Sequence, residues 1–390
     1  MKQKVAKIFF ELVRYEIANT ELNKDVIALI TPDVLPALYT LSKLHDLAHL
    51  VGNALEKNGL LPKKSKEEEL FLNERNVAFY RLASISYEYE RLCSVLEKLQ
   101  VNYLPLKGSV IRSLYPQGWL RTSADIDVLI NQNDIQVVVD EVVNTLNYTY
   151  KTTDAYNAIV VSPSGINVEL HFDLIAKCDS VPSNKILSAV WNNSTKLNNS
   201  YCHIMSGEYF YYYHVAHMAR HMFKGGCGVK PFIDLWLINK KYEFNKEKAN
   251  ALLEEGGLIK FENACYTLSK IWLENEEYTK ETTMLKNFVI DGGVFGNSQN
   301  EVLINQGKKG GRFKYILSRI FMPIEEMQHR YNVLKKHKWL YPIFLVVRCF
   351  EVLIKGDSKR IKNELKTSAQ ITSDKQQNIE NLIDYLGLKK

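Results

Sequence analysis

Residues 104–130 read LPLKGSVIRSLYPQGWLRTSADIDVLI, and residues 168–175 read VELHFDLI. The first segment runs from a short apolar strand through a Lys-Gly pair into a helical stretch, and it ends in a second apolar strand. The second segment is another β-rich stretch, with one acid between apolar residues. Because strand side chains alternate between faces, Asp125 and Asp127 project from the same face of their strand.

These acids predict a metal site. Two carboxylates that lie close together repel each other unless a cation lies between them. Glu169 joins Asp125 and Asp127 if its strand is their neighbour. Hard oxygen ligands suit Mg²⁺ or Mn²⁺, and three carboxylates can hold two divalent ions for phosphoryl or nucleotidyl displacement. The alternative is a salt-bridged sheet edge, which is costly inside an apolar strand. His171, two residues beyond Glu169, either orients that acid, touches substrate, or is a structural histidine.

The Gly-Ser pair that follows the first strand predicts a phosphate-binding turn. Gly108 lets the backbone approach a phosphate closely, and the helix after it presents N–H groups and a partial positive charge. Ser109 adds a hydroxyl donor. We predict Lys107 and Arg121 as charge partners for a triphosphate.

The surrounding sequence predicts an α+β core between helical regions. Apolar residues three and four apart predict helices over residues 1–100. Residues 101–175 alternate in the order βαβαβββ, with a Pro-Ser-Gly turn joining the last two strands. We therefore expect an N-terminal helical region (1–100), a nucleotide-binding α+β core (101–204) and a C-terminal helical domain (205–390). Within the last, Asp291–Gly311 carries six glycines and reads as a loop.

The linked set of Gly-Ser, Asp-x-Asp and a later lone acid resembles the DNA polymerase β-type nucleotidyltransferase superfamily. The quoted segments resemble one subgroup closely, a bacterial "uncharacterised nucleotidyltransferase" family. The resemblance extends over most of the chain and includes residues 214–238, HVAHMARHMFKGGCGVKPFIDLWLI. It implies a mixed sheet with helices and Mg²⁺-dependent transfer of NMP from an NTP to an acceptor, releasing pyrophosphate. By resemblance, Asp125 and Asp127 match the metal-binding pair and Glu169 the third, catalytic acid.

The resemblance leaves the acceptor open. A small molecule or sugar, a peptide and RNA are all compatible with it. Residues 301–390 carry 18 Lys and Arg against 9 Asp and Glu, which suits an anionic partner or a solvated helical surface. Aromatic–basic interleaving of the RNA-module type is absent. Two rival functions use the same site: a catalytically silent nucleotide-binding regulatory protein, and a kinase-like phosphoryl transferase.

A histidine stripe lies C-terminal to the core. His214, His217 and His221 fall at i, i+3 and i+7 of a predicted helix. A zinc site is one interpretation, although the HExxH pattern and a nearby Cys pair are lacking. In the second, the stripe lines a substrate cleft over the nucleotide-binding core, with Lys230 and Asp234 close by. In the third, these are core or interface histidines.

The composition of the chain excludes several classes of protein. The 390 residues are 46 % apolar and 24 % charged with a net charge of +6, which excludes disordered, collagen-like and small disulfide-stapled chains. Six scattered cysteines without a CxxC pair, and an N-terminus unlike a signal peptide, predict a reduced, cytoplasmic protein. The longest apolar stretch, Trp339–Ile354, is too short to span a membrane. We expect it to be a buried helix, with membrane-surface contact as the alternative. The oligomeric state stays open.

Overall fold

The computed structural model describes residues 1–154, 156–174, 181–294, 296, 298–308, 324, 327–328, 331–354 and 372–388. The chain divides into two units, one of residues 1–220 with 228–282 and the other of residues 221–227 with 283–390. The predicted boundaries at residues 100 and 204 both fall inside the first unit, and residue 204 lies within strand β7 (His203–Met205).

The first unit contains a five-stranded mixed sheet in the order β1-β2-β5-β4-β3. β1 pairs antiparallel with β2, β2 pairs parallel with β5, and the remaining pairs are antiparallel. The predicted α+β class is therefore correct. The strands are β1 Tyr103–Pro105, β2 Asp125–Ile130, β3 Thr149–Thr153, β4 Asn157–Val161 and β5 Asn167–His171.

One face of this sheet forms a hydrophobic core with two helices, α5 (Lys66–Lys98) and α7 (Ile135–Leu146). The even-numbered residues of β2 and β5 are fully buried there. Burying one such aliphatic side chain contributes about 1.5–3 kcal/mol. Because strand side chains alternate, the same packing turns the odd-numbered residues, which include Asp125, Asp127 and Glu169, to the opposite face.

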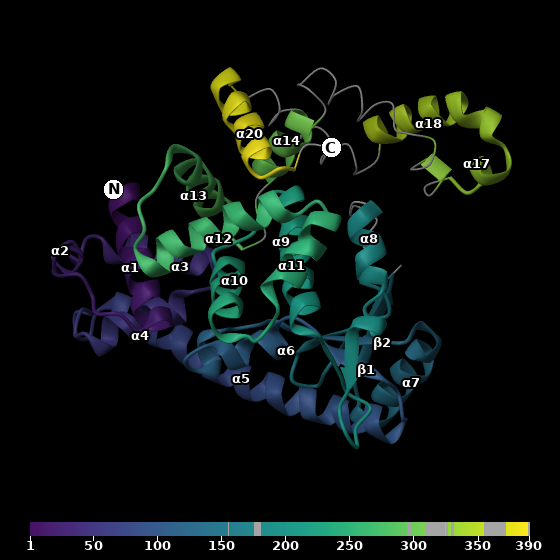
Figure 1. The fold of residues 1–390 in the computed structure, drawn as a ribbon, viewed down its shortest axis with the longest axis horizontal. Coiled ribbons are helices and arrows are strands. Elements are labelled where there is room, and N and C mark those ends of the chain that lie inside the picture. The colour runs from purple at the N-terminus through teal and green to yellow at the C-terminus, as the bar shows by residue number, and fades with distance from the viewer. Residues whose placement is uncertain are drawn as a thin grey trace. The chain divides into compact units, whose positions relative to one another are not determined.

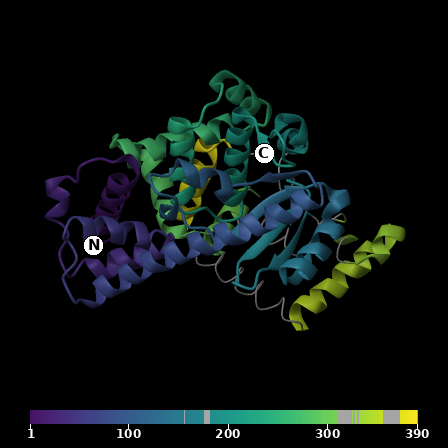
Figure 2. The ribbon, with the colours of Figure 1, turned by 90° about the horizontal axis from the view of Figure 1, so that it is seen from below.

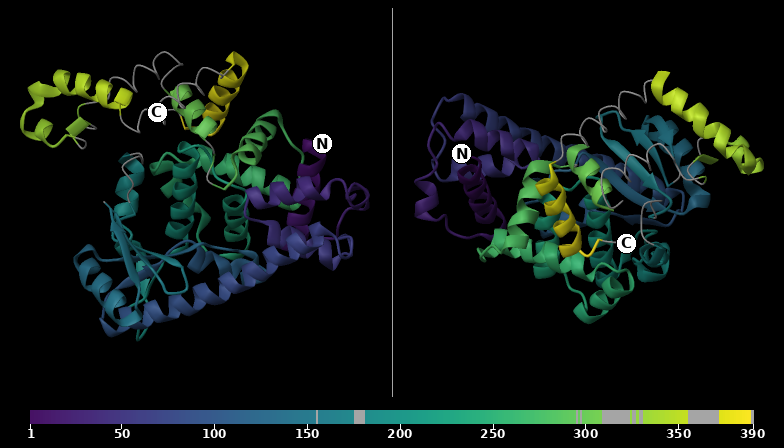
Figure 3. Two further views of the ribbon diagram at one scale, coloured as in Figure 1. Left: turned by 180° about the vertical axis from the view of Figure 1, so that it is seen from behind. Right: turned by 90° about the horizontal axis from the view of Figure 1, so that it is seen from above.

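The 33-residue helix α5 connects the sheet to the N-terminal helices (Figures 1 and 2). Its N-cap is Ser65, whose side chain accepts a hydrogen bond from the amide of Glu68, and three glutamates occupy its first turn. Figure 3 shows the sheet near one end of α5 and the N-terminal helices near the other. Those helices are α1 Lys2–Ala18, α2 Lys24–Ile27, α3 Leu35–Leu44 and α4 Ala48–Lys57.

After β5 the first unit continues as α8 (Val181–Ser188), a two-stranded hairpin and four helices. The sequence analysis missed the hairpin, whose strands are only three residues long. Tyr209–Tyr213 is buried on α9, as packing between helices requires. The elements are β6 Ser194–Lys196, β7 His203–Met205, α9 Gly207–Phe223, α10 Lys230–Lys241, α11 Lys246–Glu255 and α12 Ile259–Glu274. The last three residues of α9 belong to the second unit.

The described part of the second unit is helical. The predicted loop over 291–311 is wrong for residues 298–308, which form helix α14 because this stretch holds one glycine and the buried residues Val302 and Ile304. Residues 309–311 lie outside the described residues. The elements are α13 Lys280–Gly292, α14 Ser298–Lys308, α17 Val333–Lys336, η5 Lys338–Leu340, α18 Tyr341–Ile354 and α20 Ser373–Tyr385.

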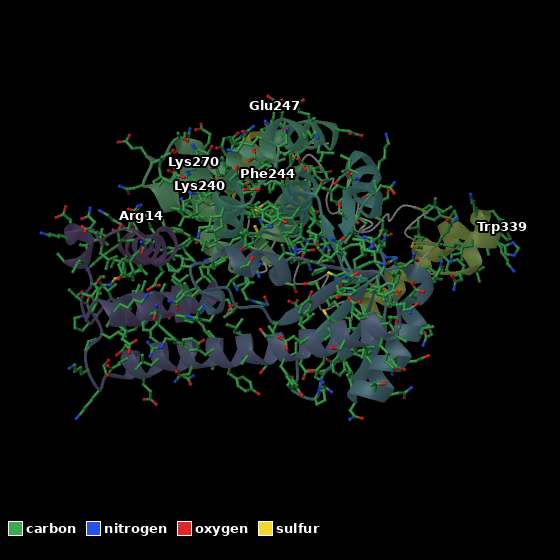
Figure 4. The ribbon with its side chains drawn as sticks, turned by 60° about the horizontal axis from the view of Figure 1, so that its bottom comes forward. Arg14, Lys240, Phe244, Glu247, Lys270 and Trp339 are labelled. Atoms are coloured by element: carbon green, nitrogen blue, oxygen red, sulfur yellow. The ribbon has the colours of Figure 1, made fainter. Side chains whose placement is uncertain are left out.

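In the apolar stretch from Trp339 to Ile354, residues 339–347 are not buried as the composition predicts. Trp339 is 73 % exposed and is labelled in Figure 4, and Ile343 and Val346 are each 55 % exposed. In the described parts of the chain, every helix is too short or too polar to cross a membrane.

Candidate functional site

The register of β2 and β5 brings two of the three predicted carboxylates, Asp127 and Glu169, together with His171, whereas Asp125 lies outside this group. Asp127 pairs with Glu169 in the parallel ladder, and Asp125 pairs with Asn167 two residues toward the start of both strands. His171 follows at the C-terminal end of β5. Its Nε2 lies 2.9 Å from Oδ1 of Asp127 and 3.3 Å from Oε2 of Glu169. One ligand atom from each of Asp127, Glu169 and His171 lies within 4.8 Å of the others, close enough to share a metal ion.

Lys107 also contacts Asp127. Its Nζ donates to Oδ1 of Asp127 at 2.7 Å. Both contacts that reach Asp127 use Oδ1, so Oδ2 accepts no hydrogen bond from the described residues. The backbone of Lys107 has φ 42° and ψ −113°, a region that non-glycine residues avoid. The turn between β1 and α6 (Gly108–Ile111) therefore stores strain that aims this ammonium at the carboxylate.

The charges of the site act on one another. Burial and the nearby carboxylates of Asp127 and Glu169 raise the pKa of Asp125 to about 6. Burial alone would raise the pKa of Asp127 too, but Lys107 and His171 hold it well below its usual range. The hydrogen bond from His171 lowers the pKa of Glu169. Burial opposes protonation of His171, yet its hydrogen bonds to the two carboxylates raise its pKa.

Asp125 is the carboxylate without a partner. In the described parts of the chain it forms no hydrogen bond or ion pair, and it is half-buried beside two other acids. Asn157 donates to Oε2 of Glu169 at 3.0 Å, so the third acid is oriented by its neighbouring strand. Such a cluster repels itself, and a divalent cation would relieve the repulsion.

Gly108 and Ser109 begin α6, which is a single turn. A Cβ atom on Gly108 would lie 2.6 Å from Oγ of Ser123 and 2.7 Å from Nη1 of Arg121, so a larger residue here would displace one of these side chains. The amide of Ser109 donates to the carbonyl of Leu106 at 3.2 Å, which removes one N–H group expected for phosphate. The Ser109 hydroxyl has no hydrogen-bond partner among the described residues.

Arg121 and Asp234 form a buried ion pair in the first unit. Nε of Arg121 donates to Oδ1 of Asp234 at 2.9 Å, and Nη2 donates to Oδ2 at 2.8 Å. The hydroxyl of Tyr115 donates to the same Oδ1 at 2.7 Å. Burial disfavours the charged form of Asp234, but Arg121 holds its pKa below the usual value. The guanidinium of Arg121, predicted to contact a triphosphate, is thus held by α10, and the carboxylate of Asp234 is engaged in the same pair.

Lys230 also forms its hydrogen bonds with residues other than Asp125, Asp127 and Glu169. Its Nζ donates to Oδ2 of Asp46 at 2.6 Å and to the carbonyl of Thr122 at 3.0 Å. Both ion pairs of α10 therefore hold residues 115–123, the long spacer between Gly-Ser and the first aspartate. They position the segment that leads into Asp125.

The three histidines of the α9 stripe lie in different surroundings in the structure. His214 is buried, and its Nε2 lies 3.1 Å from the carbonyl oxygen of Pro231. His217 lines a pocket beside the carboxylates. His221 belongs to the second unit, so its predicted place at the cleft stays a prediction. Within the described residues, the group able to hold a metal is Asp127, Glu169 and His171, which does not support zinc on the stripe.

This pocket lies between the end of β5 and α9, and its space measures about 370 Å³ including its open mouth. Lys107, His171, Tyr213, His217 and Arg220 line it together with apolar residues. Sequence reasoning missed Tyr213 and Arg220. Their signal was their spacing, because both lie on the same helical face as His217, at i−4 and i+3.

The chain matches a known protein family, although no curated protein and no solved structure matches it. The family model described as "Uncharacterised nucleotidyltransferase" matches residues 34–274, which include the sheet, all three carboxylates and both ion pairs of α10. The resemblance inferred from the sequence is confirmed, and this chain belongs to the uncharacterised nucleotidyltransferase family.

Proposed function

We propose that this chain transfers a nucleoside monophosphate from an NTP to an oxygen of an acceptor, with release of pyrophosphate. The observation that carries the proposal is the arrangement of Asp125, Asp127 and Glu169 on one face of adjacent strands, with Asp125 lacking a partner among the described residues. Family membership supports the same reaction class.

The acidic residues fit a hard divalent cation. Asp125, Oδ2 of Asp127 and the carboxylate of Glu169 offer oxygen ligands, which Mg²⁺ and Mn²⁺ prefer. When bound, such an ion would neutralise phosphate oxygens and lower the pKa of an acceptor hydroxyl. The proposed ligands are Asp125, Asp127 and Glu169, with His171 orienting the last two.

The other residues of the site would act on the nucleotide and the proton. The Ser109 hydroxyl, without a partner among the described residues, would donate to a phosphate oxygen. Lys107 carries a positive charge beside the same carboxylates and would balance charge on the triphosphate. Glu169 would accept the proton of the attacking hydroxyl, because it is ionised and oriented by Asn157.

Thermal unfolding tests where the nucleotide binds. We expect one or more of the four NTPs to raise the melting temperature of the wild type in the presence of Mg²⁺. The variant Asp125→Asn/Asp127→Asn should lose this shift. Asp140→Asn, which removes an exposed carboxylate from α7, is the matched control and should retain it.

Product analysis tests the chemistry. With radiolabelled NTP and a panel of acceptors, pyrophosphate release that requires Asp125 and Asp127 is the expected result. Release of NDP instead would assign a kinase-like phosphoryl transfer to the same site. Absence of any Mg²⁺-dependent nucleotide shift would favour the catalytically silent regulatory protein and contradict the proposal.

A further inference from the structure

The α9 pocket, whose lining includes Lys107, His171, Tyr213, His217 and Arg220, lies at the C-terminal end of β5. β1 runs antiparallel to β2, so the turn that follows Pro105 returns to the level of Asp125 at the start of β2. His171, which lines the pocket, lies two steps beyond the Asp127–Glu169 pair in the opposite direction. Neither Gly108 nor Ser109 lines the pocket, whereas Lys107, the residue before them in the turn, does.

Two polar side chains of the pocket lack partners in the described parts of the chain. Tyr213 is only 6 % exposed, and its hydroxyl makes no hydrogen bond there. Nε of Arg220 is fully buried and has no hydrogen-bond partner. Nη2 of the same guanidinium lies 3.4 Å from Nδ1 of His217. Buried polar groups without partners are rare in native proteins, so Nε of Arg220 indicates a ligand.

The charge of the pocket indicates the sign of that ligand. Lys107 and Arg220 are cationic, and His171 and His217 line the same space. Against them the described lining holds one carboxylate, that of Asp173. Arg220 forms no ion pair with a described residue. A guanidinium with free donors recognises phosphate or carboxylate groups.

We propose that the α9 pocket binds the acceptor, and that the acceptor is a small molecule that carries a phosphate or carboxylate group recognised by Arg220 and Tyr213. This rests on the proposed function. The anion fixes the molecule so that its hydroxyl faces Glu169.

The reaction then balances without a further reactant. The acceptor oxygen forms a bond to the α-phosphorus of the NTP, and the bond from that phosphorus to the bridging oxygen of pyrophosphate breaks. The hydroxyl proton passes to Glu169 and then to solvent.

Anion binding tests the pocket without NTP or metal. The probe is inorganic phosphate, added to the full chain in EDTA at constant ionic strength and followed by thermal unfolding and calorimetry. The wild type should show saturable stabilisation. Arg220→Gln should weaken phosphate binding about tenfold or more, and Tyr213→Phe should weaken it less. Arg81→Gln, which changes a partly exposed arginine of α5, is the matched control.

Two further variants keep the test decisive. Arg220→Lys retains the charge and should bind phosphate with intermediate affinity if Arg220→Gln fails to fold. Ser109→Ala reports the other phosphate site and should leave this binding unchanged. A phosphate effect lost in Ser109→Ala but kept in Arg220→Gln would overturn the pocket while leaving the proposed transferase intact. So would absence of any saturable phosphate effect, or an Arg220-dependent effect of an RNA oligomer where phosphate has none.

Discussion

Asp127 on β2 lies directly opposite Glu169 on β5 in a parallel ladder, and the two carboxylates share the ring nitrogen of His171. Asp125 stands next to this pair without a partner among the described residues. In the absence of metal the ionised form of Asp125 destabilises the fold, because burial and the charges of Asp127 and Glu169 disfavour it.

Neutralising Asp125 should therefore stabilise the metal-free protein. The pKa of Asp125 rises from 3.8 to about 6 on folding. Each unit corresponds to about 1.4 kcal/mol, so Asp125→Asn should raise the free energy of unfolding by about 1–3 kcal/mol at pH 7.5. Urea denaturation in EDTA measures this. Mg²⁺ should reverse the order by stabilising the wild type alone. A destabilised variant in EDTA would contradict the electrostatic account, and Asp140→Asn controls for charge removal.

The strained backbone of Lys107 gives a second prediction. Lys107→Gly and Lys107→Ala both remove the ion pair with Asp127, so they differ mainly in backbone strain at φ 42°. Relief of strain contributes about 1–3 kcal/mol, and the extra chain entropy of unfolded glycine removes part of it. We expect Lys107→Gly to be more stable than Lys107→Ala by about 1 kcal/mol in chemical denaturation.

The reference pair for this comparison is Lys98→Gly and Lys98→Ala at the end of α5. Lys98 is helical and exposed, so glycine should be the less stable substitution there. The same order at both positions would rule out strain at Lys107.

The sequence predicted the carboxylate site better than its surroundings. The period of two in β2 and the apolar flanks of Glu169 are local features, and β5 is indeed the neighbour of β2. No local sequence feature predicts the strained backbone of Lys107, because lysine rarely adopts φ and ψ angles of this kind. The ion pair of Arg121 could not be predicted from local pattern, because its partner Asp234 lies 113 residues away in the sequence. The role of Arg121 as a charge partner for a triphosphate stays a prediction. Likewise, composition could not tell that Trp339 is exposed.

The ion pair between Arg121 and Asp234 gives a third prediction. Removing one partner leaves a buried charge unpaired, which costs about 3–5 kcal/mol. Arg121→Met and Asp234→Leu should each destabilise the protein by this amount in urea denaturation. The double variant should cost far less than their sum, because it removes both charges. The exposed pair of Lys240 and Glu274, whose lysine is labelled in Figure 4, should show a coupling of about 1 kcal/mol or less.

Strict additivity at Arg121 and Asp234 would contradict this prediction. A further readout separates positioning from stability alone. Tyr115→Phe removes one hydrogen bond to Asp234 and should cost about 1 kcal/mol. If the pair positions the spacer that leads into Asp125, Asp234→Leu should also weaken Mg²⁺-dependent nucleotide binding at temperatures where the variant is folded.

His49 gives the pH dependence of stability. It is buried, and its Nε2 lies 3.0 Å from the carbonyl oxygen of Leu120. Burial lowers the pKa of His49 to about 4, with Lys230 acting in the same direction and Asp46 and Glu74 opposing. The folded state therefore keeps the ring neutral where the unfolded state, with a pKa of 6.5, is protonated.

The contribution of neutral His49 to the free energy of unfolding is fully present above pH 6.5, and it falls as the pH drops toward 4. A shift of about 2.5 units corresponds to at most about 3 kcal/mol. His49→Gln, which retains a donor for the Leu120 carbonyl, should flatten the slope of unfolding free energy between pH 6.5 and pH 4.5. Urea denaturation at several pH values measures the slope. His337→Gln, at an exposed histidine outside the first unit, should leave it unchanged. Equal slopes in the wild type and His49→Gln would assign the acid sensitivity to other groups.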